Sequence, residues 1–349
     1  MTIERDFLKD VKRSTLKYGM LTMKNFLKKF VQQSLISSVA LLGLTATASA
    51  AGYPEKPITM LVAYGPGGGT DLIARLIAPY VEKYLGNDAR IVVSNKAGAG
   101  GAIGFTELAR ATPDGYTIGF LNTPNLISIP IERQANYTWR GFDLIGNLVD
   151  DPGAFTVNSA SPMKDLKDLV TYAKANPGKV TVGSTGVGSD DHLAMLFFER
   201  AAGVKMTHVP YKGSAEVRTG ILTGQLVVGA INVGEALQFM QGGAPMRMLG
   251  QMSLKRTNLA PDTPTFAEQG FQMESASLRG LAAPKGLPAD VREKLVKAVA
   301  QAAADPGYLK QAALLFAPVR YLAPAAYEKE LISTEKDLLQ LWKVAPWKE

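Results

Sequence analysis

Short apolar runs alternate along the chain with longer stretches in which apolar residues recur every three or four positions. The short runs predict β-strands, and the longer stretches predict amphipathic helices. Such an alternation is typical of βαβ units and indicates an α/β fold with parallel sheets covered by helices, in which ligands bind beyond the carboxyl ends of the strands. The predicted strands are Ile58–Tyr64, Arg90–Ser94, Thr117–Leu121, Val180–Ser184, Thr207–Val209 and Leu226–Ile231.

The first glycine-rich loop, Gly65 to Asp71, follows a predicted strand and precedes a helix whose apolar face begins at Leu72. Thr70 is the expected N-cap of this helix. Glycines let a backbone approach a ligand closely, and the first-turn N–H groups and the helix dipole attract an anion. The loop therefore predicts an anion site, although a plain tight turn remains an alternative.

A second loop, Ser184 to His192, repeats this arrangement before another helix, with Ser189 as the expected N-cap. Two helix N-termini from separate parts of the chain could hold one carboxylate between them. Asp190 and Asp191 either recognise an amine on the ligand or simply favour the helix dipole. A third loop, Asn95 to Gly101, could line the same cleft or only turn the chain.

The sequence motifs of dinucleotide binding, nucleotide-phosphate binding and serine hydrolysis are missing from the chain. Neither glycine loop matches G-x-G-x-x-G, since Thr70 and Ile103 stand at the last glycine position, and Walker A and G-x-S-x-G sequences are missing. The two histidines, His192 and His208, have no partner at metal-ligand spacing, so we expect structural roles for them. We therefore predict no catalytic residue, no metal and no cofactor.

The basic character of the chain is concentrated at its start. The formal charge is +7, but residues 1–50 carry a surplus of five Lys and Arg, which leaves +2 for the rest and no basic field for nucleic acid. This part of the chain has the pattern of a secretory signal with cleavage after Ala50. The pattern consists of the basic residues Lys24, Lys28 and Lys29, the apolar stretch from Leu35 to Leu44, and then Ala48-Ser49-Ala50. Met1, Met20 and Met23 remain alternative starts.

The compartment follows from the same features. The apolar stretch of the leader is too short to span a bilayer, and later segments lack 18 uninterrupted apolar residues. The chain has no cysteine, hence no disulfide, no thiolate ligand and no lipid-anchored cysteine. An unanchored binding protein needs an enclosed compartment, so we predict the periplasm of a Gram-negative cell.

Ordered motifs along residues 53–345 give a family resemblance. The chain strongly resembles the tripartite tricarboxylate transporter receptors, also called the Bug or TctC-like family of periplasmic solute-binding proteins. The motifs that carry the resemblance are Tyr53 to Ile58, Pro66 to Asp71, Asn95 with Gly98 to Gly101, Pro113 to Thr117, His208 to Ser214, Pro261 to Thr265 and Ala283 to Gly286.

The resemblance implies a two-lobed Venus-flytrap fold, of the type II-like periplasmic-binding-protein class, with a ligand cleft between its lobes. Residues 51–154 plus 274–349 would form lobe 1, residues 155–273 would form lobe 2, and residues 1–50 would be the leader. Family members hold a carboxylate with main-chain N–H groups, hydroxyls and waters. The matching ligand-binding positions are Tyr64, Gly67, Gly68, Gly69, Thr70, Asp71, Asn122, Thr123, Ser184, Thr185, Gly188, Ser189, His192 and Asn232.

Two further positions remain open. Val227 stands where relatives often carry Asp, which puts a polar role at this position in doubt. Arg279 is a ligand contact or, as we favour, part of a hinge salt bridge. The expected function is a monomeric periplasmic receptor that captures a small carboxylate for a tripartite tricarboxylate-type transporter, with one large and one small membrane permease subunit as partners. The alternatives are an exported enzyme acting on a small organic acid and a ligand sensor for a signalling partner.

Overall fold

The computed structural model describes residues 52–347. The predicted leader and its cleavage site after Ala50 lie outside the described residues. The described residues cluster as one compact unit. Among the helices of the described range, none has both the length and the apolarity needed to cross a membrane.

All six predicted strands are present, with ends shifted by a few residues. They are β1 (Ile58–Val62), β2 (Ile91–Asn95), β3 (Thr117–Thr123), β5 (Thr181–Ser184), β6 (Thr207–Pro210) and β7 (Val228–Asn232). As expected, β1 pairs in parallel with β2 and β3, and β5 pairs in parallel with β6 and β7. The sequence therefore identified the parallel core of each lobe.

The antiparallel strands were not predicted, so the sheet is mixed rather than parallel. They are β4 (Phe142–Asn158), β8 (Met246–Gln251), β9 (Ala276–Pro284) and β10 (Val319–Leu322). The strand order is β2-β1-β3-β9-β4-β7-β5-β6, with β8 and β10 also paired to β4. The 17-residue β4 runs through both lobes, and β9 pairs with it from Phe142 to Pro152.

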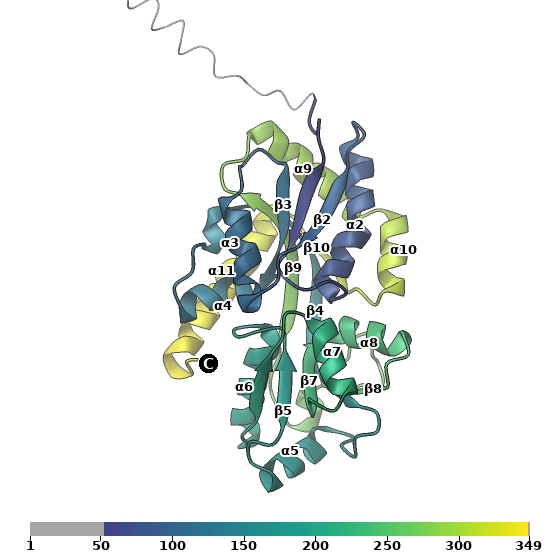
Figure 1. Ribbon diagram of the computed structural model, residues 1–349, viewed down its shortest axis with the longest axis vertical. Coiled ribbons are helices and arrows are strands. Elements are labelled where there is room, and N and C mark those ends of the chain that lie inside the picture. The colour runs from purple at the N-terminus through teal and green to yellow at the C-terminus, as the bar shows by residue number, and fades with distance from the viewer. Residues whose placement is uncertain (1–51, 348–349) are drawn as a thin grey trace, which may run out of the picture. The chain divides into compact units, whose positions relative to one another are not determined.

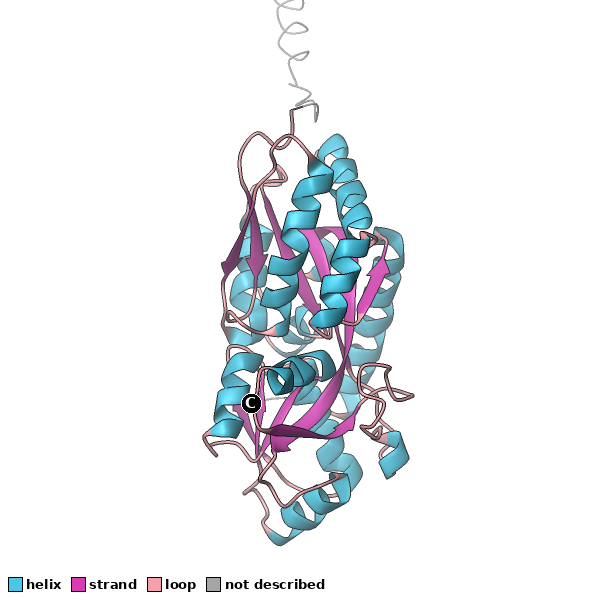
Figure 2. Ribbon diagram, turned by 90° about the vertical axis from the view of Figure 1, so that its right-hand side faces the viewer, coloured by secondary structure: helices cyan, strands magenta, loops and turns pink. Residues whose placement is uncertain are grey.

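Helices cover both faces of this curled sheet (Figures 1 and 2). In the first lobe they are α2 (Gly69–Leu85), α3 (Ala102–Arg110), α4 (Asn125–Glu132), α9 (Ala289–Ala303), α10 (Pro306–Leu314) and α11 (Pro324–Val344); in the second they are α5 (Leu166–Ala175), α6 (Asp190–Ala202), α7 (Ser214–Leu222) and α8 (Val233–Gln241). One large buried cluster fills the first lobe, and two smaller ones fill the second. The exact lobe limits at residues 154 and 274 stay a prediction.

Candidate functional site

A polar cavity lies where the two lobes meet. Its volume is about 20 Å³, which suffices for about one water molecule. An organic acid can therefore enter only when the lobes move apart. The cavity is lined by Tyr64, Gly68, Gly69, Thr70, Asn122, Asn125, Thr185, Asp190, Gly213, Ser214, Asn232, Glu235, Ser277 and Arg279.

Half of the predicted site residues line this cavity, and the other half do not. Those that line it are Tyr64, Gly68, Gly69, Thr70, Asn122, Thr185 and Asn232; those that do not are Gly67, Asp71, Thr123, Ser184, Gly188, Ser189 and His192.

The first glycine loop is shaped by Asp71. The Gly67 N–H donates to Asp71 Oδ2 at 2.9 Å, and Arg75 and Asn95 also donate to this carboxylate. These bonds lower the pKa of Asp71 although burial opposes them. Asp71 therefore supports the loop rather than facing the cavity.

The start of α2 differs from the expectation. The helix begins at Gly69 with Gly68 as its N-cap, and no side chain caps it, so the assignment of Thr70 as N-cap was wrong. Thr70 Oγ1 instead accepts from Asn122 Nδ2 at 2.8 Å. Because glycine supplies no capping oxygen, the first N–H groups of α2 are left for another acceptor.

That acceptor is a carboxylate from the other lobe. The Gly69 N–H donates to Glu235 Oε1 at 2.9 Å across 166 residues of sequence. Two more bonds join the lobes, from Gly65 N to Lys212 O at 2.9 Å and from Ser128 Oγ to Gly188 O at 2.5 Å. Glu235 thus occupies one of the anion-binding positions that the sequence assigned to a ligand.

The second loop is satisfied by its own side chains. Ser189 caps α6 as predicted, since its Oγ accepts from His192 N at 3.1 Å. Asp191 Oδ2 accepts from the Thr185 N–H and hydroxyl, and His192 Nδ1 accepts from the Gly188 N–H. This loop therefore brings a carboxyl group, Asp190, to the cavity instead of an open row of N–H groups.

A different helix supplies the second N-terminus at the cavity. Gly213 and Ser214, at the start of α7, line the cavity beside Gly68. A Cβ on Gly68 would lie 3.2 Å from Ser214 Oγ. The pair of N-termini that could hold a carboxylate is thus that of α2 and α7.

The two histidines stack behind the second loop. Their ring centroids are 4.0 Å apart, and His208 Nε2 lies 2.6 Å from Ser184 Oγ. Burial lowers the pKa of His192 to about 3, with a contribution from His208, and burial lowers that of His208 to about 4. Both rings are therefore neutral at neutral pH.

This neutrality predicts a pH dependence of stability that a His208→Gln variant reveals. Unfolded imidazoles take up protons below about pH 6.5, whereas the folded rings do so only near pH 3 to 4, so the histidines destabilise the fold as the pH falls through this window. The free energy of unfolding of the wild type relative to the variant should therefore decrease from pH 7 to pH 4. Urea unfolding at several pH values measures this difference, and a constant difference would contradict the lowered pKa.

An ionic cluster lies under the cavity at the crossover strands. Arg279 Nη2 lies 3.2 Å from Asp151 Oδ2 and 3.4 Å from Glu235 Oε1, and it donates to Asn232 Oδ1 at 2.9 Å. Arg279 also lines the cavity. It can therefore be both a ligand contact and part of a hinge salt bridge, the two roles that the sequence left open.

The sequence analysis missed Asn125, Gly213, Ser214, Glu235 and Ser277. A signal existed for Glu235, because Asn232 and Glu235 have the spacing of a capping box and the Asn232 N–H donates to Glu235 Oε2 at 3.2 Å. Gly213 and Ser214 belong to a motif that the resemblance had highlighted. For Asn125 and Ser277 we find no sequence signal.

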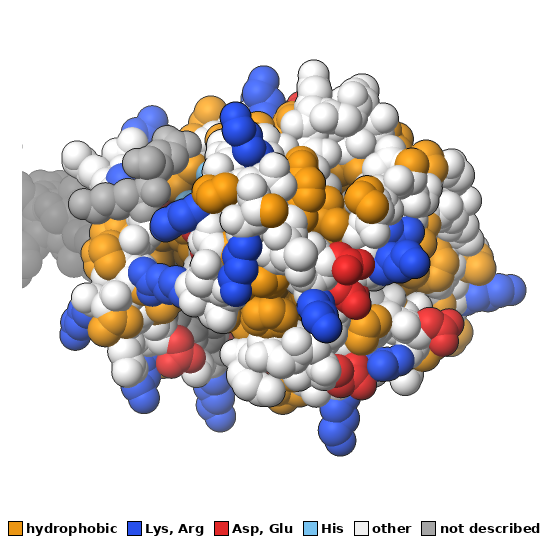
Figure 3. Space-filling view, turned by 90° about the horizontal axis from the view of Figure 1, so that it is seen from below, with side chains coloured by type: hydrophobic (Ala, Val, Ile, Leu, Met, Phe, Trp, Pro, Cys, Tyr) orange, Lys and Arg blue, Asp and Glu red, His pale blue; other side chains and the backbone are white. Residues whose placement is uncertain are grey.

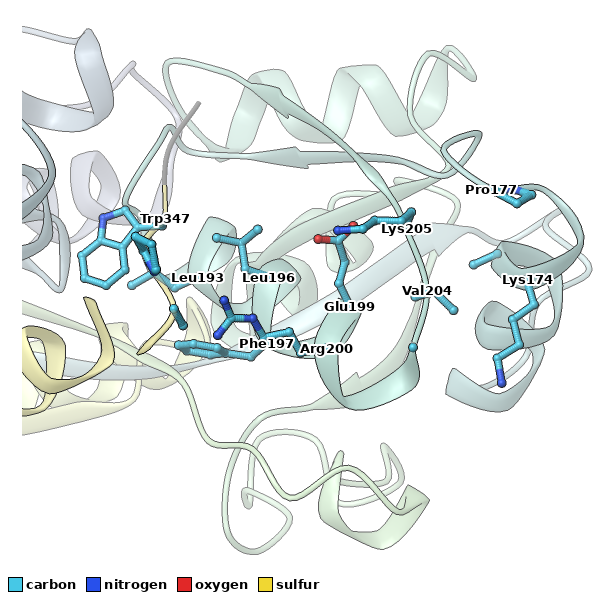
Figure 4. Close-up of a pocket in the computed structure, with 14 residues that line it drawn as sticks. Lys174, Pro177, Leu193, Leu196, Phe197, Glu199, Arg200, Val204, Lys205 and Trp347 are labelled. Carbon is cyan, nitrogen blue, oxygen red and sulfur yellow. The ribbon is translucent and has the colours of Figure 1, made fainter. Parts of the chain in front are cut away.

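A larger and separate pocket lies beside the end of α11 (Figure 4). Its volume is about 620 Å³, and Leu193, Leu196 and Phe197 of α6 face Trp347 across it. Lys174, Arg200 and Lys205 also belong to its rim. None of the predicted ligand-binding residues lines it.

Comparisons with known proteins agree with this fold. A family model described as the tripartite tricarboxylate transporter family receptor matches residues 73–320. The periplasmic binding protein BugD superposes with a TM-score of 0.80 at 32% identity, over 85% of this chain and 99% of BugD. MatC from Rhodopseudomonas palustris with bound malate gives 0.77 at 25% identity, over 83% and 99% of the two chains. Another protein of that organism, solved with adipate, gives 0.79 at 25% identity, over 84% and 99%.

The fold is therefore that of a two-lobed periplasmic binding protein, with its polar cavity between the lobes. The chain belongs to the tripartite tricarboxylate transporter receptor family, which includes the Bug proteins. The resemblance found in the sequence is confirmed. Family and fold are those of solute-binding receptors.

Proposed function

We propose that the protein is a periplasmic receptor that binds a small di- or tricarboxylate and delivers it, unchanged, to a tripartite tricarboxylate-type transporter. The observation that carries this proposal is the cavity between the N-termini of α2 and α7. Helix N-termini favour anions, and two structural neighbours were solved with the dicarboxylates malate and adipate.

Ligand binding would act through lobe closure. With the lobes apart, a carboxylate reaches the α2 N-terminus; with the lobes together, α7 contacts it as well. A ligand that binds the closed form better shifts the equilibrium toward that form. Membrane permease subunits, one large and one small, would then recognise the closed receptor, and a sensor function would use the same pocket with a different partner.

The location follows from the leader pattern. We propose that residues 1–50 direct export and are removed after Ala50. Periplasmic binding proteins among the structural neighbours support this location.

On the face shown in Figure 3, Lys and Arg side chains are scattered among neutral ones rather than gathered in one patch.

One contact favours an enzyme as the second candidate, namely the 2.6 Å separation of Ser184 Oγ and His208 Nε2. This is the spacing of a serine nucleophile and its base. However, Ser184 is fully buried, its Oγ accepts from the Gly186 N–H at 3.1 Å, and it does not line the cavity. These features support a structural role for the pair and a receptor without turnover.

Calorimetric titration of the purified protein tests the proposal. The probes are succinate, glutarate, adipate, malate and citrate, each beside its amide. We expect at least one acid to bind with a stoichiometry of one and its amide to bind at least about 100-fold more weakly, since the amide lacks charge-assisted hydrogen bonds. Proton NMR of the recovered ligand should show no change, and a consumed ligand would favour the enzyme instead.

A further inference from the structure

The cavity is surrounded by more carboxyl groups than cations. Asp190 and Glu235 line it, Asp151 pairs with Arg279 beneath it, and Asp191 holds Thr185 at its wall. Each of the four acids is at most 6% exposed. Within the described residues, Arg279 is the cation that lines this cavity.

Arg279 cannot balance this group alone. With all four acids ionised, the cluster would hold three negative charges in excess, in a place from which water is largely excluded. Neither Asp190 nor Asp191 has a cationic hydrogen-bond partner, because Asp190 Oδ2 accepts from the neutral amide of Asn232, at 2.8 Å, and Asp191 Oδ2 accepts from Thr185. Of these two acids, Asp190 lines the cavity. A buried charge without a partner is costly, so the cluster requires either protons or a further cation.

The ionisation behaviour of the acids agrees with this deficit. Burial raises the pKa of Asp151 to about 7 and that of Asp190 to about 6, and it raises the pKa of Asp191 well above its usual range. Tyr64, which lines the cavity from the end of β1, has a raised pKa because of burial and the nearby Asp190.

Polar atoms without partners point independently to a ligand. Asn122 Oδ1 and Ser214 Oγ have no hydrogen-bond partner among the described residues, although both side chains are at most 5% exposed and line the cavity. The Asn122 amide nitrogen is already bound to Thr70, so its oxygen remains available as an acceptor. An acceptor of this kind suits an N–H donor, whereas the Ser214 hydroxyl at the α7 N-terminus suits a carboxylate.

We propose that the receptor selects carboxylates that also carry a cationic amino group, with Asp190 and Glu235 as the partners of the ammonium and the N-termini of α2 and α7 as those of the carboxylate. This inference rests on the proposed function and narrows its ligand class to amino acids and related aminocarboxylates. It resolves the ambiguity of Asp190 in favour of amine recognition. The ammonium replaces the protons that the cluster otherwise takes up.

Matched ligand pairs test the inference by calorimetry at pH 7.5. The pairs are L-aspartate with succinate, L-glutamate with glutarate, and L-2-aminoadipate with adipate, which differ only in the amino group. The amino member of at least one pair should bind at least about 10-fold more tightly, the gain expected from one charge-assisted contact in a buried site. Equal or tighter binding of the plain dicarboxylate in every pair would overturn the inference and leave the proposed function standing, whereas no binding by any carboxylate would overturn both.

Two variants test whether Asp190 causes the preference for amino ligands. Asp190→Asn should reduce affinity for the amino ligand by at least about 10-fold and leave the plain dicarboxylate unchanged or bound more tightly. Asp262→Asn removes an exposed acid of the same lobe and should change neither affinity. An unchanged amine preference in Asp190→Asn would contradict the assignment.

A pH titration of the wild type provides a measurement that needs no variant. The charged and titratable groups near Asp190 are Glu235 of α8, Arg279 of β9, Asp151 of β4, Tyr64 after β1 and its neighbour Asp191. An ammonium favours the ionised forms of Asp190, Asp151 and Asp191, whose pKa values burial raises, so affinity for the amino ligand should rise between pH 6 and pH 8. A plain dicarboxylate needs these three aspartates protonated, so its affinity should fall over the same range, and identical profiles would contradict the inference.

Discussion

An Arg279→Met variant is expected to lose about 3 to 5 kcal/mol of unfolding free energy, the usual cost of removing one partner from a buried ion pair. Methionine is similar in length, so the loss would come from charge and not from a cavity. Arg279 is 3% exposed, and its removal leaves Asp151 and Glu235 without their cation. Urea unfolding at pH 7.5 measures the change.

A matched control exists on the surface. Arg320 also bridges two acids, Asp150 and Glu330, but its side chain is 43% exposed, so Arg320→Met should cost at most about 1 kcal/mol. Because burial raises the pKa of Asp151 to about 7, this acid becomes neutral as the pH falls, and the deficit of Arg279→Met should shrink toward pH 5. A loss no greater than that of Arg320→Met would contradict the role assigned to Arg279.

A Gly186→Ala variant should bind ligand at least about 100-fold more weakly, because closure requires two backbones to touch and lost closure removes the contacts of one lobe. Gly186 follows β5 in the second lobe, and a Cβ there would lie 2.6 Å from Gly100 Cα, which precedes α3 in the first lobe. Non-bonded carbon atoms do not approach this closely, so the lobes could not come fully together. Calorimetry measures the affinity, and small-angle X-ray scattering with ligand should show a larger radius of gyration than in the wild type.

The strain of alanine in a left-handed conformation must be separated from this collision. Gly186 has φ of +124°, and Gly203 at the end of α6 has φ of +64° with nothing within 4 Å of a Cβ. Gly203→Ala should therefore lower the melting temperature and leave affinity unchanged. Equal affinity losses in both variants would show that strain, and not blocked closure, weakens binding.

The strands that sequence reasoning missed share a physical cause. Asp150-Asp151-Pro152-Gly153 reads as a turn, yet it lies inside β4, where neighbouring strands satisfy its backbone and Asp151 pairs with Arg279. Here the local preference for a turn is overridden by pairing with β9, more than 120 residues later in the chain. The parallel strands were predictable because each is a short apolar run bounded by its own turn residues.

In the candidate site, too, local features could be predicted from the sequence and long-range contacts could not. Glycine loops at strand ends are local patterns, and these loops do lead to the cavity. The charge relations of Asp190, Glu235 and Arg279 join separate parts of the chain, so spacing alone could not show them. The sequence left amine recognition and the helix dipole both open for Asp190, and its burial beside Glu235 favours amine recognition.

The paired crossover strands restrict how the lobes can move. Because β4 and β9 pair from Phe142↔Pro284 to Pro152↔Ala276, the lobes cannot slide past each other along this ribbon, and they can move apart only on the side that faces away from it. What remains is rotation about an axis near this two-stranded ribbon, and Arg279 lies on it, paired with Val149. A ligand that changes the charge around Arg279 therefore acts at the pivot, where little displacement is needed to change the angle between the lobes.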